Sequence, residues 1–186
     1  MKRHLVRQHI IKTASDLFYK NGYNRTGINE IIKEANIAKA TLYNHFKSKE
    51  DICVAYLKYK NEGFIENLKT YIDTQPKGKQ RLLSLFDFLE SFYSSSGFNG
   101  CWCINTVSEI PKSNEIVKRE IIAQKNTFIQ FINGLVQDNI DNYKDDESIK
   151  IAKQIYVLYE AAISESNLQE NPWPIHSAKS ICKQII

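Results

Sequence analysis

Apolar residues recur every three or four positions along most of this sequence, and that spacing is typical of helices with one buried face. The first stripe, over about residues 2–21, is formed by Val6, Ile10, Ala14, Leu17 and Phe18. Gly22 follows, and glycine often ends a helix because it accepts the left-handed backbone of the cap, which lets Tyr23 fold back on Phe18. The alternation of a half-buried strand is nearly absent, so the pattern predicts an all-α fold.

Start and stop signals divide the remaining sequence into about eight further helices. We expect Thr26 to cap a short second helix, and a third helix to run from about Ala38 to Phe46. Ser48 with Asp51 resembles a capping box and begins a longer fourth helix. The later helices are expected between the loops 73–78 and 94–100, between Cys101 and Ile110, and over about 114–140, 146–168 and 175–186. The pattern thus predicts a three-helix domain over 1–48 and a helical domain over 49–186.

Length and composition are those of a folded protein with a core of its own. The chain has 186 residues, of which 42% are apolar and 25% charged, and such a chain buries roughly 70% of its extended surface. No run of about 20 apolar residues is present, so we expect no membrane span. The N-terminus is basic but lacks the apolar core and cleavage site of a signal peptide. We therefore expect a cytoplasmic protein with reduced thiols.

Charge separates the two predicted domains. The first sixty residues carry 12 Lys and Arg against 5 Asp and Glu, whereas the remaining 126 carry 13 against 16. A net charge of +7 at the N-terminal end suits a partner rich in phosphate, although a chance excess on a solvated face is the alternative. The pattern of side chains in this part has to decide between them.

The second and third helices, with about three residues between them, have the spacing of a helix-turn-helix. The turn is Asn36-Ile37-Ala38, and asparagine tolerates the left-handed backbone that such a turn requires. Leu42 and Phe46 would face inward. The side chains that project away from them, toward a DNA major groove, are Lys39, Ala40, Thr41, Tyr43, Asn44 and His45. Lys and Tyr reach phosphate oxygens, while Thr and Asn read base edges, so the sequence predicts a DNA-binding helix.

Residues 26–52 resemble the DNA-binding signature of the TetR family of bacterial transcriptional repressors. The run Thr-Leu-Tyr-Asn-His-Phe-Lys-Ser-Lys-Glu-Asp, from Thr41 to Asp51, carries the resemblance, which extends over about residues 5–55. It implies a homodimer that binds a palindromic operator and releases it when a small molecule enters the C-terminal domain. No catalytic activity and no cofactor is implied.

The resemblance also assigns roles to single residues. Tyr43, His45 and Lys49 are similar to a clamp on backbone phosphates, and Lys39 and Thr41 to groove contacts. Thr26 would cap the second helix beside a phosphate, with Arg25 next to it. The sequence departs from the common pattern at Asn36, Ala38 and Ala40. An alanine at 38 removes a helix cap worth about 1 kcal/mol. As an alternative, Tyr43 and Phe46 are core residues and His45 is a surface histidine.

Cys101 and Cys103 flank Trp102 at the predicted start of the sixth helix, where free amides lower the pKa of a thiol. A sensor of oxidants or electrophiles, known in a branch of the resembled family, is one interpretation, and packing as small apolar residues is the other. The spacing C-x-C without nearby histidine does not favour zinc, so we expect no metal. Cys53 and Cys182 lie on apolar faces and are expected in the core or an interface.

The C-terminal domain is rich in aromatic residues, and some of them are expected to line a ligand pocket. The candidates are Phe86, Phe88, Phe92, Trp102, Phe128, Phe131, Tyr156 and Tyr159, with Cys101, Cys103, Asn105, Glu109, Gln124 and Glu160 beside them. Mostly apolar walls with a few polar groups are typical of small-molecule sites. The net charge of −3 favours a neutral or cationic aromatic inducer over an anion. The alternative is that the aromatic residues simply fill the core.

The sequence pattern bears on three classes of function. The favoured one is a ligand-responsive repressor that acts as a homodimer, with the last two helices pairing through Ile155, Leu158, Ala162, Ile181, Ile185 and Ile186. A DNA-binding protein controlled by a protein partner is the alternative. An enzyme with Cys101 as nucleophile and His176 as base has little support, because no catalytic motif accompanies this distant pair.

Overall fold

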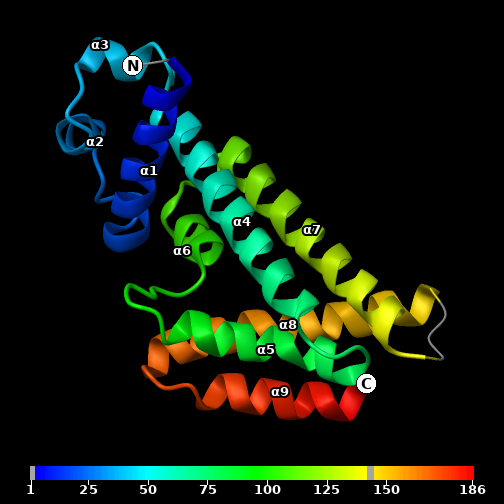
Figure 1. Cartoon of the computed structure of the whole chain (residues 1–186). Helices are drawn as coiled ribbons and strands as arrows, with labels where there is room; N and C mark the ends of the chain where they lie inside the picture. The colour runs from blue at the N-terminus through cyan, green and yellow to red at the C-terminus, as the bar shows by residue number, and fades with distance from the viewer. Residues whose placement is uncertain (1–2, 142–144) are drawn as a thin grey trace. The chain divides into compact units, whose positions relative to one another are not determined.

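The structure, a computed structural model, describes residues 3–141 and 145–186, and within these ranges it contains nine α-helices and no strand (Figure 1). The predicted all-α fold is confirmed. The helices are α1 (Arg3–Asn21), α2 (Ile28–Glu34), α3 (Lys39–Tyr43), α4 (Lys49–Asp73), α5 (Lys79–Tyr93), α6 (Trp102–Glu109), α7 (Glu115–Asn139), α8 (Asp145–Gln169) and α9 (Trp173–Ile185). Over the described residues, none of the helices combines the length and the apolar character needed to cross a membrane.

The chain forms two compact units. The first contains Met1–Phe64 and Trp102–Ile122, and the second contains Ile65–Cys101 and Ala123–Ile186. Helices α4 and α7 are each continuous through the point where one unit gives way to the other. The two units are defined by how the chain packs, so they do not test the predicted functional boundary between residues 48 and 49. That boundary stays a prediction.

The first unit is built on α1, whose Ile10, Ala14 and Phe18 are buried. Gly22 adopts φ +91° and donates its N–H to the carbonyl of Phe18 at 3.0 Å, which ends the helix as predicted. The Tyr23 ring then lies 5.6 Å from the Phe18 ring, centre to centre. The expected fold-back of Tyr23 is thereby confirmed.

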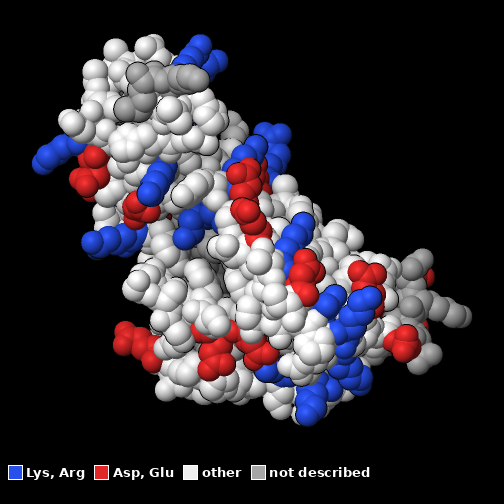
Figure 2. Space-filling model, viewed as in Figure 1, with Lys and Arg blue, Asp and Glu red and all other residues white. Residues whose placement is uncertain are grey.

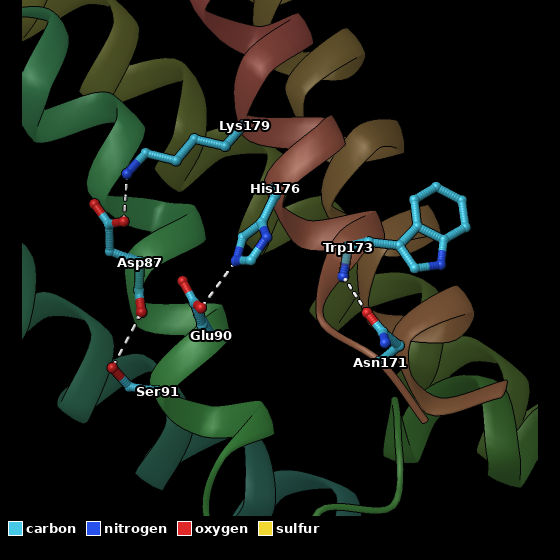
Figure 3. Close-up of polar contacts among 7 residues, drawn as sticks. All are labelled: Asp87, Glu90, Ser91, Asn171, Trp173, His176 and Lys179. Atoms are coloured by element: carbon cyan, nitrogen blue, oxygen red, sulfur yellow. Dashed lines mark hydrogen bonds and ion pairs between the residues drawn. The ribbon is translucent and has the colours of Figure 1, made fainter. Parts of the chain in front are cut away.

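The second unit contains α5, α8 and α9, which lie side by side (Figure 1). Phe86 of α5 and Tyr159 of α8 are buried with ring centres 6.0 Å apart. Figure 3 shows two polar contacts between α9 and α5, an ion pair that joins Lys179 to Asp87 and a hydrogen bond between the His176 ring and the Glu90 carboxylate at 2.9 Å. These contacts fix one face of α9 against α5.

The face of α8 and α9 that reaches solvent differs from the predicted dimer face. Ile155, Ala162 and Ile186 were expected to be solvated on one subunit, but they are buried within it. They are buried because α8 turns this side toward α5 and α9. Of the predicted set, Ile181 is exposed as expected; the other exposed large apolar side chains of the two helices are Val157, Leu168 and Trp173, of which Leu168 is 74% exposed.

Candidate functional site

The turn between α2 and α3 has the geometry expected of a helix-turn-helix. Asn36 adopts φ +49°, the left-handed conformation predicted from its residue type. Ala38 is the N-terminal cap of α3 and makes no side-chain capping bond. The departure at residue 38 therefore does leave α3 without a hydroxyl cap.

Helix α3 presents its polar residues on one side. Leu42 and Phe46 are buried, as predicted, and the guanidinium of Arg7 lies 4.9 Å above the Phe46 ring. On the other side Tyr43 is 44% exposed, so the alternative that places it in the core is wrong. The structure brings the candidates together in one short segment, where Lys39, Ala40 and Asn44 are exposed and Thr41 and His45 half-buried.

Lys49 begins α4, directly after the cap that Ser48 provides. The Ser48 hydroxyl oxygen accepts the N–H of Asp51 at 3.1 Å, and the Asp51 carboxylate accepts the N–H of Lys47 at 3.1 Å, so the predicted capping is confirmed. The Lys49 ammonium lies 4.2 Å from the centre of the Tyr23 ring. Partial burial lowers its pKa, against the opposing influence of the nearby thiol and carboxylates. The ring holds this ammonium in place beside the helix-turn-helix.

Thr26 does not cap α2, and this prediction was wrong. Its hydroxyl donates to the carbonyls of Gly22 at 2.8 Å and Leu17 at 3.3 Å, and its side chain is fully buried. The cap is Gly27, whose N–H is accepted by Glu30 at 3.3 Å. Thr26 therefore ties α2 to the end of α1 and offers DNA no exposed group. Arg25, next to it, is exposed.

Glu109 lies at the end of α6 and contacts the turn between α1 and α2. Its carboxylate accepts the backbone N–H of Asn24 at 2.7 Å, and its carbonyl accepts the Asn24 side-chain amide at 2.8 Å. A Cβ on Gly22 would lie only 2.4 Å from the same carboxylate. Glu109 was expected to line a ligand pocket. In the structure its carboxylate is engaged by the DNA-binding part of the chain.

A buried polar cluster in the second unit joins three of the other candidates to a lysine. The Lys125 ammonium donates to the Glu160 carboxylate at 2.6 Å and lies 3.2 Å from the sulfur of Cys101. Burial is the main cause that raises the pKa of Glu160 to about 7, although Lys125 acts in the opposite direction. Among the residues that the structure describes, the second Glu160 oxygen and the Tyr159 hydroxyl are buried and have no hydrogen-bond partner. Two polar atoms of this cluster therefore keep an unused capacity for hydrogen bonding.

Aromatic rings surround this cluster. The Phe128 ring centre lies 5.2 Å from that of Tyr159 and 6.3 Å from that of Tyr156. Phe86 packs on the other side of Tyr159, and Gln124 is buried on α7. Phe92 packs against the loop after α5, where its ring centre lies 5.4 Å from that of Phe98.

Trp102, Cys103 and Asn105 belong to the first unit. The centre of the Trp102 ring is 5.3 Å from that of Phe64, and its buried Nε1–H has no acceptor among residues 3–141 and 145–186. Cys103 is buried on the same helix and Asn105 is half-buried. All four cysteines are buried, and burial raises the pKa of both Cys53 and Cys182 to about 12. The expected core positions of Cys53 and Cys182 are confirmed.

Lys125 is not among the site residues predicted from the sequence, although the sequence contains a signal that it is buried. It falls on the apolar stripe of α7, four residues after Ile121 and three before Phe128. A charged residue in such a stripe indicates a buried partner. In the part of the chain that the structure describes, no group of three or more His, Cys, Asp or Glu side chains is arranged to hold a metal ion.

Residues 10–56 match the family model described as bacterial regulatory proteins, tetR family. The chain is 26% identical over 148 residues to the fatty acid metabolism regulator protein of Bacillus subtilis, covering 78% of this chain and 75% of that protein. It is 21% identical over 188 residues to the HTH-type transcriptional repressor NemR of Escherichia coli, covering 98% and 94%. One relative is named a regulator of metabolism and the other a transcriptional repressor, and neither name describes an enzyme.

Solved structures share the fold. The TetR-family transcriptional regulator SCO4454 from Streptomyces coelicolor superposes with a TM-score of 0.85 at 23% identity, over 97% of this chain and 93% of that one. The reduced form of NemR from Escherichia coli gives a TM-score of 0.87 at 20% identity, over 97% and 96%. The architecture of the whole chain is therefore that of known regulators of this kind.

Proposed function

We propose that this chain is a transcriptional repressor that a small molecule releases from a palindromic operator, because its residues 10–56 match the family model of bacterial regulatory proteins of the tetR family. The observation that carries the proposal is the arrangement of α3. Its inward residues Leu42 and Phe46 are buried, and its polar residues face the opposite way. Such a helix fits the major groove, which is about 12 Å wide.

The contacts to DNA divide into two kinds. Tyr43, His45 and Lys49, with Arg25, are proposed to bind phosphates, because they are exposed or half-buried at the ends of α2, α3 and α4. Lys39, Ala40, Thr41 and Asn44 are proposed to meet base edges. Phosphate contacts act on all sequences, whereas base contacts discriminate between them.

A homodimer is proposed to form through α8 and α9. Val157, Ala161 and Leu168 follow one exposed line of α8 at spacings of four and seven residues, and Trp173 and Ile181 extend the apolar area on α9. Pairing two copies would remove these side chains from water. The two recognition helices are then expected about 34–36 Å apart, or at a multiple of that spacing. A cytoplasmic location is part of the same proposal.

The inducer is proposed to act at the cluster of Cys101, Lys125 and Glu160. The unpartnered oxygens of Glu160 and Tyr159 suit a neutral or cationic aromatic compound that donates hydrogen bonds, with Phe128 and Phe86 as walls. The rival trigger is an electrophile that adds to the Cys101 thiol, next to which Lys125 places a positive charge. If neither class of compound releases the protein from DNA, control by a protein partner is favoured.

Selection of binding sites from random DNA, followed by titration of the selected duplex, tests DNA binding. Tyr43→Ala and Lys49→Ala should weaken binding to all sequences and flatten its salt dependence, whereas Lys39→Ala and Asn44→Ala should alter base preference. Lys183→Ala, an exposed change in α9, is the matched control and should leave both properties unchanged. Wild-type binding by the Tyr43 and Lys49 variants would contradict the phosphate contacts.

The trigger is tested on the protein bound to the selected duplex. N-ethylmaleimide serves as the electrophile, and a panel of uncharged and cationic aromatic compounds serves as the ligands. If Cys101→Ser and Cys103→Ser abolish release by N-ethylmaleimide but keep DNA binding, the thiol is the sensor. If an aromatic compound releases both variants from DNA as it releases the wild type, the cluster around Glu160 is the sensor. Release by neither class would favour the protein partner.

A further inference from the structure

A polar groove of about 480 Å³ lies in the second unit, between the loop after α5 and the end of α8. Tyr93, Ser95, Gly97, Phe98 and Asn99 line it from the loop side, and Ser166, Asn167 and Glu170 from α8 and the residue after it. None of these eight residues belongs to the cluster around Glu160 or to the helix-turn-helix. The groove is therefore a separate feature that the proposed function does not use.

Two aromatic rings form one wall of the groove. The Phe98 ring centre lies 5.2 Å from that of Tyr93, with the ring planes at 68°. Phe98 also meets Phe92 edge to face at 5.4 Å, which holds it from the other side. The backbone beside this wall is fixed as well, because Gly100 adopts φ +71° and a Cβ there would meet the Asn167 side chain at 3.1 Å.

Glu170 occupies a backbone position that disfavours it. It follows the last residue of α8 and adopts φ +49°, where glycine or asparagine is the usual residue. The N–H of Asn171 returns to the carbonyl of Ser166 at 3.3 Å, and Asn171 accepts the N–H of Trp173 at 3.0 Å at the start of α9 (Figure 3). A glutamate held in this strained turn points to a use for its carboxylate.

The surroundings of Glu170 are negative. The last turn of α8 contains no basic residue, and the carbonyls at a helix C-terminus carry partial negative charge. The lining residues include one carboxylate and no Lys or Arg. In the view of Figure 2, acidic side chains lie at the end of this unit where α8 ends and the loop after α5 runs. The Ser166 hydroxyl in the lining is fully buried and has no hydrogen-bond partner within the described residues.

We propose that this groove binds a small aromatic amine in its protonated form. The ammonium group is placed at the Glu170 carboxylate and the terminal carbonyls of α8, and the ring packs against Phe98 and Tyr93. Aromatic faces attract cations, and the carboxylate and helix end add attraction of the same sign. An anion of the same shape would meet repulsion from all three. The groove is thus a second binding site for an effector, and binding of the amine there does not require DNA.

Titration calorimetry with 2-phenylethylammonium chloride on the full-length protein, without DNA, tests this site. The neutral 2-phenylethanol and the anionic 3-phenylpropionate have nearly the same shape and serve as comparison ligands. We expect the amine to bind about fivefold or more tightly than the alcohol at low salt, and the acid to bind least. Amide resonances of Gly97 and Gly100 should shift with the amine and thereby locate the site.

Two variants distinguish the effect of the Glu170 charge on binding from the effect of its strained backbone conformation on stability. Glu170→Gln should bring the amine and the alcohol within about twofold of each other. Glu170→Gly should do the same while raising the melting temperature, because glycine accepts φ +49° without strain. Glu165→Gln, an exposed change on the same helix outside the groove, is the matched control and should bind as the wild type does. Equal affinity of wild type for amine and alcohol, or an unchanged preference in Glu170→Gln, would overturn the proposal.

Discussion

Replacing Glu160 by glutamine should make the stability of this protein less dependent on pH. Glutamine keeps the size of the side chain and removes its charge. In the wild type, burial raises the pKa of Glu160 from 4.5 to about 7. An acid with a higher pKa in the folded state holds its proton more tightly there. Folding therefore becomes less favourable as the pH rises from below 4.5 to above 7, and the glutamine variant lacks this loss.

The size of the effect follows from the two pKa values. One pKa unit corresponds to roughly 1.4 kcal/mol, and the wild type should lose on the order of 2–3 kcal/mol of unfolding free energy between pH 5 and pH 8 relative to Glu160→Gln. The side chains of both Glu160 and Lys125 are only 18% exposed, so solvent screens this penalty little. Lys125 is present in both proteins, and its attraction for the ionised Glu160 is already contained in the pKa of about 7, so it adds no separate pH dependence.

Urea denaturation followed by circular dichroism at pH 5, 6, 7 and 8 measures the difference. Both proteins must be at the same concentration, because the proposed dimer would make stability depend on concentration. Glu165→Gln is the control on the exposed side of α8 and should track the wild type at each pH. A difference between wild type and Glu160→Gln that stays constant from pH 5 to pH 8 would refute the reasoning, since Glu160 would then titrate as an exposed carboxylate does.

Three further changes have expected outcomes. Gly22→Ala should lower the unfolding free energy by about 1–2 kcal/mol in a denaturant titration, because φ is +91° and the added Cβ meets the Glu109 carboxylate. Thr26→Val should cost about 1–3 kcal/mol by the same measurement, since two carbonyls lose a buried donor, while the salt dependence of DNA binding stays as in the wild type. Leu168→Glu should shift the sedimentation coefficient from dimer to monomer at micromolar concentration, because it places a charge on the exposed apolar line of α8.

Features that depend on neighbours in sequence could be predicted. Gly22 ends α1 because the left-handed cap needs glycine, and Asn36 turns between α2 and α3 for a related reason. The spacing of four between Leu42 and Phe46 places both on the inner side of the recognition segment. These are local rules of helices and turns, and the structure follows them.

Features that depend on distant partners could not be predicted. Thr26 has the residue type of a cap, but its hydroxyl finds carbonyls of α1 and the cap moves to Gly27. Glu109 is 85 positions from Asn24, and no periodicity connects the two. On α8 the pattern gives two apolar sides, one through Ile155 and one through Val157, and only packing against α5 and α9 decides which side is buried.

The contact between Glu109 and the α1–α2 turn restricts how the sequence of α6 can change in evolution. One end of this helix is fixed by Trp102 against Phe64, and the other end by Glu109 against Asn24. Inserting or deleting a single residue between them would rotate Glu109 by about 100° around the helix axis and shift it by about 1.5 Å. Substitutions at the exposed positions Ile104, Val107 and Ser108 are compatible with both contacts, whereas changes of length are not. Relatives that retain both contacts should therefore vary at these exposed positions while conserving the number of residues in α6.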